Sequence, residues 1–353
     1  MIFHRFCVFM DGKEQFTPES FSRRFVFVTI DDLLVDSASD REFEPLNLKT
    51  TLKFVDRLES MLRNNPMKPI GLHIKDDCRM LANAVYLVGA YMVLRLGLSA
   101  DEAAQRFESL TASSAAYQSA ASDSTALQPR DCWGGLCRTA QLGWIRHKAA
   151  GTSLYQCGKT DAMAANLGDE LIVGKFILLP ADAQPQHAAA DRPDPSITNA
   201  AAALRQCGVA AVVRLAPPPS AAAADAATAL SWAGLGFADL SHAGADCAPP
   251  PPAAVAKFLL IAEELPPAAR IALHCGPAGP ARAGPLLALY AMRRHGFPAR
   301  EAMAWLAIAR PGLIPAAPAA APLRRYIVER EAVMRRTASS YHRQGPNLVL
   351  RDP

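Results

Sequence analysis

The sequence predicts an α/β protein built from two tandem, similar domains, each with a central sheet flanked by helices. The chain has 353 residues, of which 50% are hydrophobic and 20% charged, and this is enough to fill one or two cores. Two segments also follow one plan, IGLHIKDDCRMLANAVYLVGAYMVLRLGLSADEAAQRF and IALHCGPAGPARAGPLLALYAMRRHGFPAREAMAWL. Each has a strand pattern ending in histidine (His73, His274), then a loop, a helix, a glycine turn (Gly97, Gly296) and a second helix. The repeat therefore predicts two copies of one α/β domain.

Composition and the repeat divide the chain into five parts. We predict a leader over residues 1–20, a first domain over 21–150, a linker over 151–175, a second domain over 176–335 and a tail over 336–353. Three Ala/Pro tracts, at residues 216–229, 248–254 and 315–322, are predicted to be loops without a core of their own.

The elements of the second copy can be placed in order along the chain. VAAVVRL, residues 209–215, is β-branched and continuous enough to form a buried parallel strand. Ile271–Leu273 predicts another short buried strand, and a helix follows with Pro285 near its first turn. A further helix over Ala299–Ala309 follows Pro298 and ends at Arg-Pro-Gly. A strand, a glycine loop and a helix start in succession form a cradle for an anion.

Charge, hydropathy and cysteine spacing exclude several classes of protein. The net charge of +4 is small and no run of Lys and Arg alternates with aromatics, so nucleic acid is not expected as a partner. No apolar stretch reaches about 18 uninterrupted residues, and the N-terminus lacks a small-residue cleavage site. We therefore expect an intracellular protein without a membrane partner. The cysteines include no C-x2-C pair, which argues against zinc and fits reduced thiols.

The loop ALHCGPAGPARAG, residues 272–284, carries the residues that could do chemistry at the cradle. Cys275 is the candidate nucleophile, since a helix N-terminus and a nearby arginine should lower its pKa. The alternative is an ordinary buried, apolar cysteine. Arg282 is the candidate that holds an anion with its guanidinium, and its alternative is a surface arginine at a helix start. His274 is expected either to orient the loop by hydrogen bonds or to be a plain structural histidine.

Several segments together resemble the Cdc14-type dual-specificity phosphatases, of the cysteine-based protein tyrosine phosphatase superfamily. The segment HCGPAGPARAGPLLALYAMRRHGFPAREAMAWLAIARPG is similar to the signature H-C-x5-R-[ST] and the helices after it. Four more segments agree in order: FVFVTIDDLLVDSASDREFEPLNLKTTLKF, ANAVYLVGAYMVLRLGLSADEAAQRF, IVGKFILLP and GVAAVVRL. The resemblance covers roughly residues 20–335. It implies two tandem phosphatase-like domains, the first non-catalytic and the second of the catalytic type.

The resemblance implies a hydrolase that works through a phosphocysteine intermediate, with no metal and no cofactor. Its substrates would be phosphoproteins, dephosphorylated at phosphoserine or phosphothreonine followed by proline and at phosphotyrosine. It further implies a role in the cell cycle and a location in the nucleus, the cytoplasm or both, with association with spindle poles or basal bodies. The oligomeric state is left open.

The resemblance also assigns roles to individual residues. Cys275 would attack phosphorus and Arg282 would hold the phosphate oxygens. Counting back from the Lys257-Phe258-Leu259 helix places the general acid at Asp246, whose alternative is a solvated turn residue. Asp239 fits better as the end of the preceding strand. The phosphate-binding loop would comprise His274, Gly276, Ala278, Gly279, Ala281 and Arg282.

The loop departs from the pattern of this family. Six residues, Gly276–Ala281, separate cysteine and arginine where the family has five, so the loop must bulge to bring Arg282 back. Pro277 and Pro280 lack the N–H that such a loop would aim at phosphate. Ala283 replaces the family's hydroxyl residue, and the family's glutamine pair after RPG has no counterpart. These departures keep open a pseudophosphatase that binds phosphopeptides or partners without turnover, and a chain that keeps only the fold.

Overall fold

The chain folds into two compact units, as a computed structural model shows. The structure describes residues 5–10, 23–33, 43–74, 78–112, 125–147, 155–157, 168–180, 195–217, 234–242, 247–276 and 279–343. The first unit comprises Met1–Gln156, Ala307–Pro311 and Ala316–Ala321, and the second comprises Cys157–Leu306, Gly312–Pro315 and Pro322–Pro353. Each unit contains a sheet and helices, so the predicted α/β fold class is confirmed.

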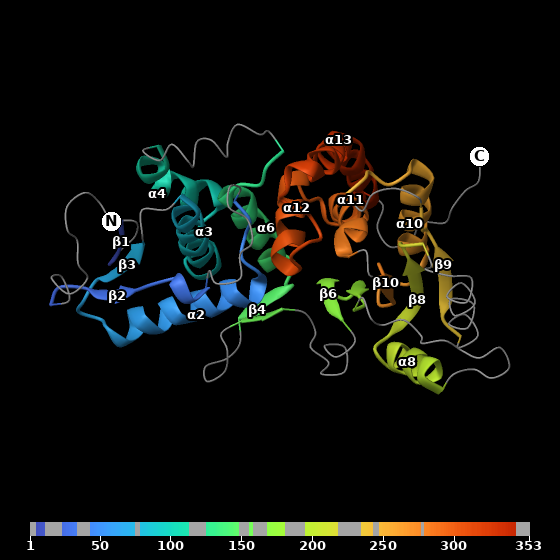
Figure 1. The fold of residues 1–353 in the computed structure, drawn as a ribbon, viewed down its shortest axis with the longest axis horizontal. Coiled ribbons are helices and arrows are strands. Elements are labelled where there is room, and N and C mark those ends of the chain that lie inside the picture. The colour runs from blue at the N-terminus through green and yellow to red at the C-terminus, as the bar shows by residue number, and fades with distance from the viewer. Residues whose placement is uncertain are drawn as a thin grey trace. The chain divides into compact units, whose positions relative to one another are not determined.

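The first unit is built on a parallel sheet with the strand order β1-β3-β2 (Figure 1). Its elements are β1 (Phe6–Met10), β2 (Val26–Val28), the short 3₁₀ helix η1 (Asp31–Leu33), α2 (Leu48–Asn64), β3 (Ile70–Ile74), α3 (Cys78–Arg95), α4 (Ala100–Ala112) and α6 (Pro129–Gln141). Two further short strands, β4 (Ile145–His147) and β5 (Tyr155–Cys157), pair with each other. The central strand β3 is buried except at His73, as expected of a parallel strand covered by helices.

Helix α3 is buried because α2 and α6 pack against it. A Cβ atom on Gly89 would lie 2.1 Å from the Trp133 indole, so glycine is what allows α6 to approach α3 this closely. Trp133 donates its Nε1–H to the Tyr86 carbonyl at 2.9 Å, and the hydroxyls of Tyr86 and Thr51 lie 2.8 Å apart. These contacts account for the almost continuous apolar sequence of α3. Among the described residues, no helix is both long enough and apolar enough to span a membrane.

The predicted domain boundaries differ from the structure at two places. The sequence predicts a leader over residues 1–20, but Phe6–Met10 pairs in register with Ile70–Ile74 as the edge strand of the first sheet. The leader prediction is wrong for these residues, because pairing between distant parallel strands leaves no local signal in the sequence. The predicted linker 151–175 likewise contains Asp169–Ile172, which joins the second sheet. The other boundaries stay predictions.

The second unit is built on a five-stranded sheet with the order β6-β7-β10-β8-β9, in which β6 alone runs antiparallel to its neighbour. Its strands are β6 (Asp169–Ile172), β7 (Phe176–Leu178), β8 (Val209–Arg214), β9 (Gly236–Asp239) and β10 (Arg270–His274). Its helices are α8 (Pro195–Gln206), α10 (Pro252–Glu264), η2 (Pro280–Arg282), α11 (Ala283–His295) and most of α12 (Ala299–Ala309) and of α13 (Ala321–Arg343). The short helix η3 (Pro318–Ala320) is assigned to the first unit.

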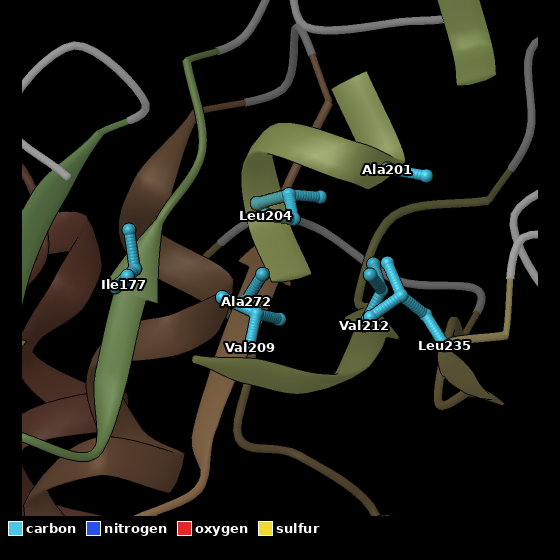
Figure 2. Packing of buried hydrophobic residues seen from close by; sticks show 7 residues of the cluster. All are labelled: Ile177, Ala201, Leu204, Val209, Val212, Leu235 and Ala272. Carbon is cyan, nitrogen blue, oxygen red and sulfur yellow. The ribbon is translucent and has the colours of Figure 1, made fainter. Parts of the chain in front are cut away.

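Helices cover both faces of this second sheet. Figure 2 shows the buried cluster that joins α8 to the sheet: Ile177, Ala201, Leu204, Val209, Val212, Leu235 and Ala272. On the opposite face, the Phe176 ring stacks on Phe258 of α10 with centroids 5.3 Å apart and meets Tyr290 of α11 at 4.9 Å. Phe176 and Ile177 are consecutive on β7 and so point to opposite faces. The sheet therefore holds its central strand β10 between two apolar layers.

The elements predicted for the second copy are found in the structure. Strand β8 covers most of the predicted segment 209–215, and β10 contains the predicted strand Ile271–Leu273. The predicted helix near Pro285 is α11, and α12 has the predicted bounds Ala299–Ala309. The local signals of strand length, proline and glycine were therefore sufficient for this part of the chain.

The Ala/Pro tracts are only partly loops. Helix α10 begins at Pro252, inside the tract 248–254, because a proline in the first helical turn has no N–H to lose. The tract 315–322 contains η3 and the start of α13. Most of the tract 216–229 lies outside the described residues. Helix α13 also extends into the predicted tail 336–353.

Candidate functional site

The carboxyl end of β10 leads into the candidate phosphate-binding loop. The strand ends at His274, and Cys275 follows it directly. The 3₁₀ helix Pro280–Arg282 then continues into α11, which begins at Ala283. The Ala283 N–H donates a hydrogen bond to the Cys275 sulfur. The cysteine is thus held between the end of a central strand and the N-terminus of a helix, where anions are favoured.

Two glycines provide the bends of the six-residue loop. Gly276 has a φ of 63° and Gly279 a φ of 95°, a left-handed region that residues with a Cβ rarely adopt. The Gly279 N–H donates to the Gly276 carbonyl at 3.4 Å. Ala281 of the predicted loop is buried in η2. Pro277 and Ala278 lie outside the described residues.

Burial dominates the acidity of the Cys275 thiol. The residue is only 4% exposed, and this burial raises the pKa of its thiol to about 12, against the opposing effects of the Ala283 N–H and the Arg282 charge. The expectation of a lowered pKa is therefore wrong for this conformation. A helix N-terminus and an arginine both stabilise the thiolate, but the free energy needed to remove a thiolate from water is larger than this stabilisation.

Arg282 is buried at the same loop. It is 7% exposed, so the alternative of a surface arginine at a helix start is wrong. Its Nη1 donates to the carbonyl oxygen of His242 at 2.9 Å. This contact joins the arginine of the loop to the segment that follows β9, so the guanidinium is oriented by backbone as well as by its own helix.

Three polar residues lie in one row across the ends of neighbouring parallel strands. His274 of β10 is in register with Arg214 of β8, and Arg214 is in register with Asp239 of β9. Arg214 and Asp239 form an ion pair, and the Arg214 guanidinium also lies over the Phe237 ring at 5.5 Å. Burial and the Arg214 charge lower the pKa of His274. Sequence reasoning missed Arg214, although its position at the end of a buried strand was a usable signal.

The predicted general acid is not placed by the structure. Asp246 lies outside the described residues, so its proposed role stays a prediction. Asp239 is the last residue of β9, as predicted. Although its partial burial raises it, hydrogen bonds from Arg214 and Ser241 bring the pKa of Asp239 down to about 2. Within the described ranges, no cluster of His, Cys, Asp and Glu is arranged to hold a metal ion.

The segment after α12 packs closely on the loop and on the start of α11. A Cβ atom on Gly284 would lie 2.0 Å from the Leu313 carbonyl oxygen. A Cβ atom on Gly312, which has a φ of 88°, would lie 3.4 Å from the ring of Pro280. Arg324 of α13 donates to the Pro315 carbonyl at 2.8 Å. The end of the candidate loop at Pro280 therefore packs against the backbone segment 312–315, which a hydrogen bond from α13 holds in place.

The candidate loop thus has a cysteine at a strand end, two glycines at positive φ and a buried arginine at the next helix start. Residues 2–139 match the family model described as "Dual specificity protein phosphatase, N-terminal half". Over 84% of its length the chain is 29% identical to the dual specificity protein phosphatase CDC14C of Homo sapiens and 28% identical to that of Symphalangus syndactylus. The predicted resemblance to the Cdc14-type dual-specificity phosphatases is thereby confirmed.

The chain spans 64% and 60% of the lengths of these two relatives. It is also 25% identical, over 82% of its length, to the tyrosine-protein phosphatase CDC14 homolog of Schizosaccharomyces pombe, of which it covers 53%. A solved structure of a putative protein tyrosine phosphatase from Leishmania major is similar with a TM-score of 0.33 and 20% sequence identity, covering 44% of this chain and 86% of that one.

Proposed function

We propose that the chain is a Cdc14-like protein phosphatase that acts on phosphoserine and phosphothreonine followed by proline, and on phosphotyrosine, through a phosphocysteine. The observation that carries the proposal is the position of Cys275 at the end of β10, with the Ala283 N–H on its sulfur and Arg282 buried at the same loop. The resemblance to the Cdc14 phosphatases supports phosphoproteins as partners. It also supports a location in the nucleus, the cytoplasm or both, and association with spindle poles or basal bodies.

The proposed reaction has two steps. In the first, the Cys275 thiolate attacks phosphorus, an S–P bond forms and the bond from phosphorus to the leaving oxygen breaks. Arg282 holds the equatorial oxygens, and Asp246 gives its proton to the leaving oxygen. In the second step, water attacks phosphorus, the S–P bond breaks and phosphate leaves. The proposed chemistry needs no metal and no cofactor.

Two features predict that both steps are slow. Burial raises the pKa of Cys275, so the thiolate needed for attack is scarce at neutral pH. Ala283 has no hydroxyl to steady the sulfur as it leaves the phosphocysteine. A thiol of raised pKa is also a poorer leaving group, so burial slows the second step too, and the missing hydroxyl slows it further. We therefore expect the intermediate to accumulate once it forms.

The second candidate function is a pseudophosphatase that binds phosphopeptides or partner proteins without turnover. The specific observation in its favour has two parts. The buried Cys275 thiol stays protonated at neutral pH, and the Arg282 guanidinium already donates a hydrogen bond to the His242 carbonyl. Such a site keeps a cradle for phosphate but lacks a ready nucleophile.

A pre-steady-state measurement separates the two functions. We expect the full chain to release a burst of up to one p-nitrophenolate per molecule from p-nitrophenyl phosphate, followed by slow turnover, and to release phosphate from a phosphoserine-proline peptide. Cys275→Ser abolishes both phases. Ala283→Ser adds the missing hydroxyl and is expected to speed the slow phase about tenfold while leaving the burst rate close to that of the parent.

A folded chain with neither burst nor turnover would rule out the phosphatase. The pseudophosphatase would then be tested by phosphopeptide binding to Cys275→Ser, with Arg282→Ala as the matched variant. Binding lost only in Arg282→Ala would support the cradle, whereas equal binding by both variants would eliminate it.

A further inference from the structure

Arg324 is a charged residue on the buried face of helix α13 that takes no part in the proposed reaction. It is 1% exposed, and Leu323 and Ile327 on the same face are fully buried. Burying a guanidinium is costly unless its charge and its N–H groups find partners. Its Nη1 donates to the Pro315 carbonyl at 2.8 Å. The side chain therefore fixes one end of the segment 312–315.

The segment 312–315 packs against the candidate loop and the helix after it at two places. A Cβ atom on Gly312 would lie 3.4 Å from the Pro280 ring, so the backbone of Gly312 lies against that proline. A Cβ atom on Gly284 would lie 2.0 Å from the Leu313 carbonyl oxygen, so this carbonyl lies against the first turn of α11. Contacts made by backbone cannot be relieved by a change of rotamer. A displacement of the segment therefore displaces the end of the loop.

The groups that would bind phosphate lie between these two contacts in the sequence. Arg282 and Ala283 stand between Pro280 and Gly284, and the Ala283 N–H donates to the Cys275 sulfur. Such groups must be held within about 0.5 Å of their productive geometry. The loop has six residues where the family pattern has five, so its end needs a constraint from outside the loop. The segment that Arg324 fixes supplies this constraint.

We propose that Arg324 is a positioning residue for the lengthened loop: by holding the Pro315 carbonyl it fixes the segment 312–315, which sets Arg282 and the Ala283 N–H for an oxyanion. The proposal rests on the proposed function, because it takes Arg282 as the phosphate-binding arginine. Arg324 acts only through the segment and does not touch the phosphate. An apolar side chain could fill the same buried space, but it could not donate to the carbonyl. The donor is therefore the feature to test.

Oxyanion binding by the full chain tests the proposal without requiring turnover. We expect Arg324→Met, an unbranched side chain without a donor, to weaken tungstate binding about tenfold in calorimetry. Arg324→Lys keeps a positively charged donor and should restore binding to within about threefold of the parent. This rescue separates the contact with the carbonyl from the filling of space. If Arg324→Met does not fold, Arg324→Gln, a shorter polar side chain, takes its place with the same expected loss.

Arg270→Met is the matched control that separates positioning from general destabilisation. Arg270 is 7% exposed and donates to the Cys207 carbonyl at 2.7 Å, so it is also a buried arginine bonded to backbone. It is the first residue of β10, at the opposite end of that strand from the candidate loop. Its loss should lower the unfolding midpoint but leave tungstate binding unchanged. Equal losses of binding in Arg270→Met and Arg324→Met, unchanged or tighter binding in Arg324→Met, or no rescue by Arg324→Lys would overturn the proposal.

The failure of the proposed function can be told apart from the failure of this inference. If the parent chain binds no tungstate, the phosphate site fails, and the positioning contact is then measured by stability alone. Arg324→Met and Gly284→Ala disturb the same segment from opposite sides, so their shifts in unfolding midpoint should combine to less than their sum. Arg270→Met and Gly284→Ala share no contact and should be additive. Full additivity in the first pair would overturn the inference.

Discussion

Burial and a helix N-terminus act in opposite directions on the thiol of Cys275. With a pKa of about 12, only about one molecule in 10⁵ carries the thiolate at pH 7. Since the thiolate is the species that reacts, we expect alkylation of Cys275 by iodoacetamide to be slow at pH 7 and to rise about tenfold per pH unit up to about pH 10. Peptide mass spectrometry of the native chain measures this rate separately for each cysteine.

The control for this measurement is the unfolded chain, in which Cys275 should react like an ordinary thiol. A native labelling rate that levels off at or below pH 8 would show that the conformation in solution exposes or activates the sulfur. The same result would favour an active phosphatase over a pseudophosphatase, because it would supply the nucleophile that attack requires.

Helix α11 and the segment after α12 can pack closely because residue 284 of α11 is a glycine. The Cβ atom that Gly284→Ala adds would lie 2.0 Å from the Leu313 carbonyl oxygen, and no side-chain rotation can relieve a contact with backbone. We expect this variant to lose about 1–3 kcal/mol of unfolding free energy, and calorimetry should show the melting temperature falling by about 2–4 °C per kcal/mol. Tungstate binding should weaken as well, because the N-terminus of α11 forms part of the candidate phosphate-binding site.

Gly174→Ala is the matched control for this variant. Gly174 has a φ of 80° but no atom within 4 Å of its hypothetical Cβ, so only backbone strain is added, about 1 kcal/mol. Gly174 lies between β6 and β7, apart from the loop, so oxyanion binding should be unchanged. If Gly284→Ala behaved like Gly174→Ala in both measurements, the close approach of α11 to Leu313 would not be needed for the site.

The elements predicted well from the sequence are those whose signals are local. Helix α12 was predictable because Pro298 precedes it and Arg-Pro-Gly ends it, and β10 because a short apolar run ends at a glycine loop. Strand β1 was missed because its partner β3 is more than 60 positions away. The start of α10 was missed because prolines were taken as loop formers, whereas Pro252 begins a helix.

The candidate site was predictable in its residues and not in its electrostatics. Cys275, Arg282 and the glycines could be found from their order in one loop. The row of His274, Arg214 and Asp239 depends on the registers of β8 with β10 and β9, and the raised pKa of Cys275 depends on how deeply the tertiary fold buries it. Neither quantity is contained in a local pattern.

On the scale of the whole molecule, each unit has, among its described residues, a carboxylate whose pKa is strongly lowered beside an arginine. In the first unit, hydrogen bonds from Arg95 and then Tyr91 hold the pKa of Glu59 at about 2, against an ordinary value of 4.5. In the second, the pKa of Asp239 is about 2, against 3.8. A lowered pKa in the folded state stabilises the fold above the ordinary value, and this stabilisation is lost as the pH falls toward about 2.

Acid should therefore destabilise both units between about pH 4.5 and pH 2, but through different residues. Glu59→Gln removes a titrating group from the first unit alone, so that unit should be less stable than in the parent at pH 6 and should lose less stability on acidification. Asp239→Asn should have the same effect on the second unit alone.

Urea unfolding at pH 6, 4 and 3, followed by pulsed hydrogen exchange of peptides from each unit, measures the two stabilities separately. Asp101→Asn, which breaks an exposed ion pair with Arg130, is the control and should change neither slope. If Glu59→Gln flattened the acid dependence of both units equally, the units would unfold as one cooperative body, and the division of the chain into two independent folds would be wrong.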